Sequence, residues 1–252
     1  MWLFKSSIGR KVVMSVTGIA LILFLTFHCA MNVVALFSGK AYNTICELLG
    51  ANWYAVLATM GLAFLAVVHI VYAFILTAQN RKARGDSRYE VATTVNGGCG
   101  VEAFASRNML VLGLIICLGL LLHLFNFWYH MMWPELIHGE EAGAIAAAAG
   151  QPGPSDGFAW IKYTFANPVY VVLYVVWIAA IWFHLTHGFW SALHTLGWSG
   201  KTWESRIKWI GLIYVTLLML GFLVVVLAFA FGIAPSLCCD GGSCCQAAAT
   251  CC

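Results

Sequence analysis

Charged side chains are scarce in this chain of 252 residues, and that scarcity limits the class of protein it can be. Only 9% of the residues are charged, whereas 62% are hydrophobic. A soluble domain carries about 25% charged residues. The composition therefore excludes a water-soluble fold for most of the chain, and we expect no separate soluble domain among its polar links.

Long apolar stretches are present in place of charge. Crossing a hydrocarbon layer of ~30 Å takes about 20 helical residues. Five stretches are long enough: Val12–Phe37, Tyr54–Gln79, Asn108–Met131, Pro168–Leu196 and Ile207–Ile233. The first is too long, and its flanks too unlike a cleavage site, to be a removable signal peptide. We expect an all-α integral membrane domain with five transmembrane helices over residues 1–233. A flexible Cys-rich tail over residues 234–252 follows, with disulfides or a soft metal site as its alternative.

The basic residues divide unevenly between the two sets of links. Eleven of the thirteen lie in the N-terminal segment, the link between spans two and three, and the link between spans four and five. Only Lys40 and Lys162 lie on the opposite side. Because cytoplasmic links carry an excess of Lys and Arg, the N-terminus is predicted to be cytoplasmic and the C-terminus to lie outside.

Four histidines lie inside four different spans, where ionisable side chains are rare because hydrocarbon does not solvate them. At about 1.5 Å per helical residue, His28 and His123 are expected in an outer layer. By the same count His69 and His184 share an inner layer roughly 10 Å away. Two imidazoles from different helices at one depth are what a bis-histidine haem requires. The pattern predicts two b haems in a four-helix core, with the histidine-free fifth span as a packing helix.

Other interpretations of these histidines stay open. A single intramembrane histidine is more often a hydrogen-bonded packing residue than a ligand, and a series of histidines can relay protons in a transporter. Zinc and copper sites usually gather three or four ligands, which two layers of two fit poorly. His187 lies one turn after His184 on nearly the same helix face, so it is an alternative ligand.

The segments around the histidines form a series of motifs. They are SIGRK at 7–11, FLTFHCAMN at 24–32, HIVY at 69–72 with TAQN at 77–80, HL at 123–124 and FHLTHGFWS at 183–191. These motifs resemble those of a known family, the dihaem cytochrome b subunits of succinate:quinone and quinol:fumarate oxidoreductases. The resemblance covers roughly residues 6–233, and its motifs occur in the order expected on the five spans.

The resemblance implies a membrane anchor in a bacterial cytoplasmic membrane, with a FAD-carrying flavoprotein and an iron–sulfur subunit as cytoplasmic partners. Succinate and fumarate would react on the flavoprotein. This chain has neither a dinucleotide-binding glycine fingerprint nor ferredoxin-like cysteine spacing. It would carry electrons between the iron–sulfur subunit and a quinone, usually menaquinone in dihaem members, bound near the outer haem. Some fumarate reductases of the family carry a proton-path Glu two residues before the fourth-span ligand. Trp182 stands there in this chain and puts that path in doubt.

Haem propionates need donors or cations, and a quinone needs hydrogen-bond partners and a proton carrier. Candidates for the propionates are Ser15, Arg10, Lys11 and Lys208. The basic residues could instead contact lipid headgroups. Ser15 could instead form a hydrogen bond to the backbone of its own helix. Candidates for the quinone site are Asn32, Glu47, Asn126 and His130. Solvated or packing roles are the alternatives for these four.

The predicted function is electron transfer within a succinate dehydrogenase or fumarate reductase of the respiratory chain. Two alternatives stay open: a cytochrome b subunit of another dehydrogenase or reductase, and a histidine-relay transporter. The expected partners are the lipid bilayer, the quinone and the two cytoplasmic subunits, with no nucleic acid. The sequence leaves open the direction of catalysis, the haem potentials, the exact quinone pocket and whether the complexes form dimers.

Overall fold

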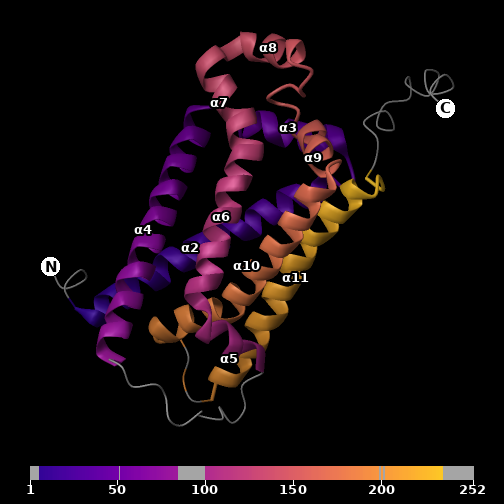
Figure 1. The fold of residues 1–252 in the computed structure, drawn as a ribbon. Coiled ribbons are helices and arrows are strands. Elements are labelled where there is room, and N and C mark those ends of the chain that lie inside the picture. Colours follow the sequence, from indigo (N-terminus) through magenta and orange to yellow (C-terminus); the bar gives the residue numbers. More distant parts are fainter. Residues whose placement is uncertain (1–5, 51, 85–99, 199, 201, 235–252) are drawn as a thin grey trace. The chain divides into compact units, whose positions relative to one another are not determined.

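The computed structural model describes residues 6–50, 52–84, 100–198, 200 and 202–234. Every regular element in this part of the chain is a helix (Figure 1). Five helical runs are long and apolar enough to cross a membrane: Ser7–Val34, Trp53–Ala83, Met109–Ala148, Pro168–Thr195 and Glu204–Ala230. The predicted all-α architecture with five membrane-spanning segments is confirmed at this level. The Cys-rich tail lies outside the described residues.

Four of the runs are single helices: α2 (Ser7–Val34), α4 (Trp53–Arg84), α10 (Pro168–Thr195) and α11 (Glu204–Ala230). The first helix begins five residues before the predicted span, which started at residue 12. The reason is a polar cap, since the Ser6 hydroxyl oxygen accepts a hydrogen bond from the Gly9 backbone N–H at 2.9 Å. Such a cap satisfies one of the amide groups that a helix start leaves unpaired.

The third run is composite. It comprises α6 (Met109–His123), the π-helical turn η1 (Leu124–Trp128), α7 (Tyr129–His138), the 3₁₀ turn η2 (Gly139–Glu141) and α8 (Ala142–Ala148). It continues past the predicted end at Met131 through the rest of α7 and through η2 to α8, which consists mainly of alanine, the strongest helix former. The π turn lies directly after His123, and such turns are frequent at functional sites.

Short helices connect the long ones: α3 (Gly39–Leu48), α5 (Gly100–Arg107) and α9 (Gly157–Phe165). Helices α3 and α9 pack side by side (Figure 1). Asp156 caps α9 by accepting from the Ala159 backbone N–H at 3.0 Å. The Asn43 amide of α3 donates to the same carboxylate at 2.8 Å and accepts from the Phe158 backbone N–H at 2.9 Å. One polar side chain therefore holds the two helices together.

The chain packs into two compact units, and each long run contributes to both. Unit 1 comprises Met1–Thr26, Thr59–Ile116 and Ala179–Met219. Unit 2 comprises Phe27–Ala58, Cys117–Ile178 and Leu220–Cys252. Unit 1 contains a small apolar core in which α5, α6 and α10 meet. Its buried members are Ala105, Leu112 and Ala180, with Ile116 and Phe183 packed against them. Each predicted histidine pair falls within a single unit.

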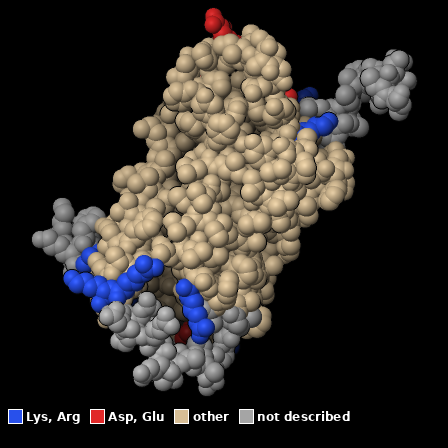
Figure 2. All heavy atoms as spheres, viewed as in Figure 1, with Lys and Arg blue, Asp and Glu red and all other residues tan. Residues whose placement is uncertain are grey.

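Large apolar side chains are exposed along the long helices. Examples are Leu23, Phe64, Leu118, Val172 and Leu217, each more than half exposed. Figure 2 shows a broad uncharged surface over the helices. Contiguous apolar surface of this kind is unfavourable in water and is solvated by lipid tails. The surface is therefore that expected of a multi-pass membrane protein.

The described basic side chains divide between the units as the sequence divides them between links. Lys40 and Lys162 belong to unit 2. The others belong to unit 1: Arg10, Lys11, Arg81, Lys82, Arg107, Arg206 and Lys208. Unit 1 thus contains the basic residues for which a cytoplasmic position is predicted, and the orientation itself stays a prediction.

Candidate functional site

The first histidine pair lies in unit 2. His28 comes from α2 and His123 is the last residue of α6, and their ring centroids are 5.8 Å apart with planes at 84°. Phe222 contacts His28 at 5.8 Å, while Phe127 and Trp177 contact His123 at 5.1 and 5.5 Å. Two imidazoles from different helices therefore face each other inside a wall of aromatic rings.

The second pair lies in unit 1. His69 of α4 and His184 of α10 have ring centroids 6.5 Å apart and planes at 66°. His187 belongs to the same helix as His184, but its ring contacts Trp190 at 5.4 Å. The structure thus brings His184, rather than His187, against His69.

Thr17 orients the His69 ring. Its Oγ1 lies 3.1 Å from His69 Nδ1. The same hydroxyl donates its proton to a backbone carbonyl of its own helix, with Val13 O at 2.9 Å and Met14 O at 3.0 Å. When that proton goes to the carbonyl, the Thr17 oxygen acts as the acceptor and His69 Nδ1 carries the ring proton. In that tautomer the lone pair is on Nε2. A metal-binding histidine has this arrangement, with one ring nitrogen free to bind the metal and the other making a hydrogen bond.

One ring nitrogen of His184 lacks a hydrogen-bond partner among the described residues. Its Nδ1 is buried and has no hydrogen-bond partner within the described part of the chain. An unpaired buried donor or acceptor costs about 1–3 kcal/mol, and such groups in native proteins usually mark a functional position or a missing partner. The atom belongs to one of the two facing pairs, which is where a bound group would be held.

In unit 2, Tyr174 contacts a ring nitrogen of His123. The Tyr174 hydroxyl lies 3.4 Å from His123 Nδ1 and accepts a hydrogen bond from the Asn126 side-chain amide at 3.4 Å. Both polar side chains are buried, Tyr174 at 4% and Asn126 at 6% exposed. Asn126, a sequence candidate for the quinone site, therefore lies one hydrogen bond from a residue that contacts the first histidine pair.

Two glycines permit close approach to the histidine pairs. A Cβ atom on Gly119 would lie 2.1 Å from Trp177 Cδ1, and Trp177 packs against His123. A Cβ atom on Gly18 would lie 3.3 Å from His69 Cε1. Glycine at these positions thus lets side chains reach the histidines at distances that any larger residue would obstruct.

A cavity of about 690 Å³ opens in unit 2 beside the π turn. Its lining includes the sequence candidates Asn126 and His130. The remaining lining residues are Phe125, Gln151, Trp160, Tyr163, Thr164, Ala166, Asn167, Pro168 and Tyr170. His130 Nδ1 lies 2.7 Å from the Phe125 carbonyl oxygen and so carries the ring proton, which leaves Nε2 as the acceptor. The site thus combines a large aromatic lining with a few polar groups, as small-molecule sites do.

The other two quinone candidates are placed elsewhere. The Asn32 amide donates to the His28 carbonyl oxygen at 2.7 Å and its Oδ1 accepts from the Tyr42 hydroxyl at 3.3 Å, so both ends of this side chain are engaged. Glu47 is exposed on α3. Neither residue lines the 690 Å³ cavity.

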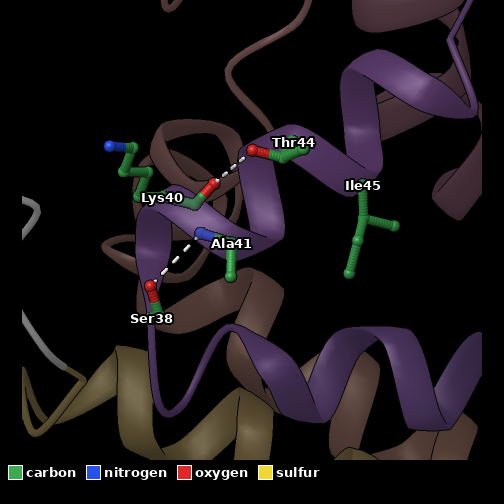
Figure 3. Close-up of a pocket in the computed structure, with 5 residues that line it drawn as sticks. All are labelled: Ser38, Lys40, Ala41, Thr44 and Ile45. Atoms are coloured by element: carbon green, nitrogen blue, oxygen red, sulfur yellow. Dashed lines mark hydrogen bonds between the residues drawn. The ribbon is translucent and has the colours of Figure 1, made fainter.

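A second hollow, of about 600 Å³, lies on the surface of α3 (Figure 3). Ser38 accepts from the Ala41 backbone N–H at 3.2 Å and the Thr44 hydroxyl donates to the Lys40 carbonyl oxygen at 3.1 Å, so its polar atoms serve the helix itself. This depression is open and contains no histidine, and we assign no function to it.

Two ionisable groups outside the spans lie between α3 and α9. Burial raises the pKa of the Cys46 thiol from 9.0 to about 11, and the neighbouring carboxylates of Asp156 and Glu135 add to that effect. Burial also raises the pKa of the Tyr42 hydroxyl. Cys46 packs closely against α9, because a Cβ atom on Gly157 would lie 2.4 Å from its sulfur. Both groups are therefore neutral near pH 7.

The propionate candidates belong to unit 1. Ser15 is buried at 7% exposed, Arg10 is half-buried and Lys11 is exposed. Lys208 Nζ pairs with Glu204 Oε1 at 2.9 Å and lies 4.4 Å from the centre of the Trp190 ring. The Lys208 charge is therefore already compensated in this structure.

Trp182, which stands where some family members carry a proton-path Glu, donates from Nε1 to Thr216 Oγ1 at 2.9 Å. This hydrogen bond joins α10 to α11. An indole held in this way has no exchangeable acid to offer, so the position serves helix packing in this chain.

Three residues near the histidines were missed by the sequence reasoning: Thr17, Tyr174 and Trp177. For two of them, the helical period could have indicated a position near the site. Thr17 precedes His28 by three turns, and Trp177 precedes His184 by two, so each shares a face with a histidine that the sequence singles out. No such signal points to Tyr174.

The histidine pairs, their hydrogen-bond partners and the adjacent cavity are the observations from which a function can be argued. No family model, curated protein or solved structure matches this chain.

Proposed function

We propose that this chain is the dihaem cytochrome b anchor of a succinate dehydrogenase or fumarate reductase complex. It carries electrons between the iron–sulfur subunit and a membrane quinone, menaquinone by the resemblance. The supporting observation is the pair of facing imidazoles in each unit, His28 with His123 at 5.8 Å and His69 with His184 at 6.5 Å. Each pair draws its members from two different helices.

The centroid distances fit two imidazoles on opposite sides of one iron. A metal–imidazole nitrogen bond is about 2 Å long and a ring nitrogen lies about 1 Å from its ring centre, so the expected centroid separation is about 6 Å. The observed 5.8 and 6.5 Å bracket this value. Two imidazoles bound to one iron would be free to differ in the angle between their planes, so the observed 84° and 66° are compatible with such a site. Pairs rather than triads also match the described residues, where no three His, Cys, Asp or Glu side chains converge on one point.

The residues of this chain would hold and tune the haems. Haem supplies one-electron transfer when it is bound. Thr17 would fix the tautomer of His69, and the Tyr174 hydroxyl lies 3.4 Å from His123 Nδ1. Hydrogen bonds of this kind set ring orientation and ligand basicity. Trp177, Phe127 and Phe222 exclude water from the first pair.

The 690 Å³ cavity is the proposed quinone site. Asn126 and His130 line it, and Asn126 lies one hydrogen-bonded residue from His123. The acceptor nitrogen of His130 suits a quinol hydroxyl, from which it can take the proton as the quinol is oxidised. Asn32 and Glu47 lie outside this lining, and their assignment to the quinone stays a prediction.

The remaining parts of the proposal rest on charge and on the resemblance. The basic residues of unit 1 favour a cytoplasmic position for that part of the chain in a bacterial membrane, where the flavoprotein and the iron–sulfur subunit would dock. The inner propionates would be served by Ser15, Arg10 or Lys11. Lys208 would join them only by exchanging its bond to Glu204.

The test is the visible spectrum and the haem content of the purified full chain. We expect a b-type reduced-minus-oxidised spectrum and two haems per chain by the pyridine haemochrome assay. Colourless protein would exclude this cytochrome, and a cytochrome of any other dehydrogenase as well, and would favour a histidine relay. Copurification with a flavoprotein and an iron–sulfur subunit then distinguishes a succinate or fumarate complex from another reductase.

A further inference from the structure

The buried hydroxyl of Tyr174 lies between the first histidine pair and the cavity wall. The tyrosine ring is held by four aromatic neighbours: Phe165 at 5.1 Å, Trp177 at 5.7 Å, His123 at 6.1 Å and Phe127 at 6.3 Å. At 4% exposure the side chain has little room to move. A buried tyrosine hydroxyl needs polar partners, and here both partners belong to functional groups, His123 and Asn126.

Asn126 connects that hydroxyl to the cavity. It is the middle residue of the π turn η1 and lines the cavity, although only 6% of it is exposed. Its Nδ2 donates to Tyr174, and no described residue donates to its Oδ1. A molecule in the cavity can therefore compete for the Asn126 amide protons or bond to its free oxygen.

The positions of the protons determine how a molecule in the cavity would affect the hydrogen bond between Tyr174 and His123. If His123 binds a metal through Nε2, its Nδ1 carries the proton and donates to the Tyr174 oxygen. The Tyr174 oxygen then accepts from both His123 and Asn126. When a carbonyl in the cavity takes the Asn126 N–H, the Tyr174 oxygen has one donor left, and its bond to His123 strengthens. A stronger bond at Nδ1 makes an imidazole ligand more basic.

We propose that Tyr174 is a positioning residue that couples the occupancy of the cavity to the electronic state of the outer haem through His123. The inference rests on the proposed function, because it needs the haem as reporter. The molecule that acts on it has a carbonyl acceptor on an aromatic or quinoid ring, since the lining is aromatic and Asn126 offers an amide donor. Binding of such a molecule lowers the potential of the outer haem and changes its ferric spectrum.

The test uses the purified full chain with menadione as the probe and Tyr174→Phe as the variant. This change removes one oxygen and keeps the ring. Tyr72→Phe is the matched control, because it removes the same oxygen from a tyrosine of α4 in unit 1 that does not line the cavity. The readouts are the electron paramagnetic resonance spectrum of the ferric outer haem and its redox midpoint, each with and without menadione.

We expect menadione to shift both readouts in the wild type and in Tyr72→Phe. In Tyr174→Phe the two haems stay bound, menadione still binds, and the shift is lost. A shift that survives in Tyr174→Phe overturns the inference and leaves the proposed function intact. Loss of the shift in both variants, or its absence from the wild type, also overturns it. Wild-type protein without haem overturns the proposed function itself.

Discussion

Replacing Gly119 by alanine tests how closely the wall around the first histidine pair is packed. Gly119 lies on α6 one turn before His123. An added Cβ would lie 2.1, 2.3 and 2.4 Å from Trp177 Cδ1, Nε1 and Cγ. Separations below 3.0 Å cannot be tolerated, and the atoms involved are the base of the indole rather than a flexible tip. The ring of Trp177 must therefore move, and with it the surface that packs against His123 at 5.5 Å.

The magnitude follows from two opposing effects. Replacing glycine by alanine within a helix stabilises by roughly 0.5–1 kcal/mol, while overpacking of a closely packed interior costs about 1–3 kcal/mol. We expect Gly119→Ala to be destabilised by about 1–2 kcal/mol overall and to lose part of its outer haem while retaining the inner one. Gly113→Ala is the control on the same helix, because a Cβ there meets nothing within 4 Å.

The assay combines thermal unfolding in detergent, followed by circular dichroism, with reduced-minus-oxidised difference spectra. Gly113→Ala should unfold at or slightly above the wild-type temperature with both haems present. Gly119→Ala should unfold earlier and show a selective loss of one haem. If Gly119→Ala matches Gly113→Ala in both measurements, the close packing of Trp177 against α6 is not needed for stability or for haem binding at His123.

Further predictions concern the second histidine pair, the cavity and α3. Thr17→Val removes the acceptor of the His69 Nδ1 proton, and it should weaken retention of the inner haem about 10- to 100-fold, as loss of such partners does. Thr26→Val on the same helix should not, and equal haem loss in both variants would refute the role of Thr17. His130→Phe should raise the menadione Kd about tenfold, equivalent to about 1.4 kcal/mol, with both haems retained; an unchanged Kd would move the quinone site elsewhere. Cys46 should react slowly with iodoacetamide at pH 8 and faster as pH rises toward about 11, by peptide mass mapping. Because its folded pKa is raised, the folded state binds the proton more tightly. Its contribution to stability is therefore present below pH 9.0 and lost as pH rises toward about 11. Rapid alkylation of folded protein at pH 8 would contradict this.

The membrane helices could be predicted from the sequence because apolar length is a property of each segment alone. Their ends differ where local chemistry decides, as at Ser6, whose side chain starts α2 before the apolar stretch begins. The π turn after His123 carries no comparable signal, since its residues Leu124–Trp128 suit an α-helix equally well. Yet this turn contains Asn126 and adjoins the cavity.

The histidines of the site could be placed by counting residues along helices, because helix geometry converts sequence position into depth. Their hydrogen-bond partners could not. A threonine in a span usually bonds to its own helix, and only packing shows that Thr17 also reaches His69. The cavity lining depends on residues far apart in sequence, such as Asn126 and Tyr170. Asn32 has the expected position one turn after His28, but its amide is engaged by the His28 carbonyl oxygen and Tyr42.

The pairing of the histidines is tested most directly by counting haems in single and double alanine variants. His28→Ala, His123→Ala and the double variant should each retain one and the same haem, because either loss removes one site. His69→Ala and His184→Ala should each retain the other haem, and His138→Ala, at an exposed position, should retain both. A His28→Ala, His123→Ala double variant that loses both haems, when each single variant loses only one, would contradict the pairing. Retention of both haems in His184→Ala would move that ligand to His187.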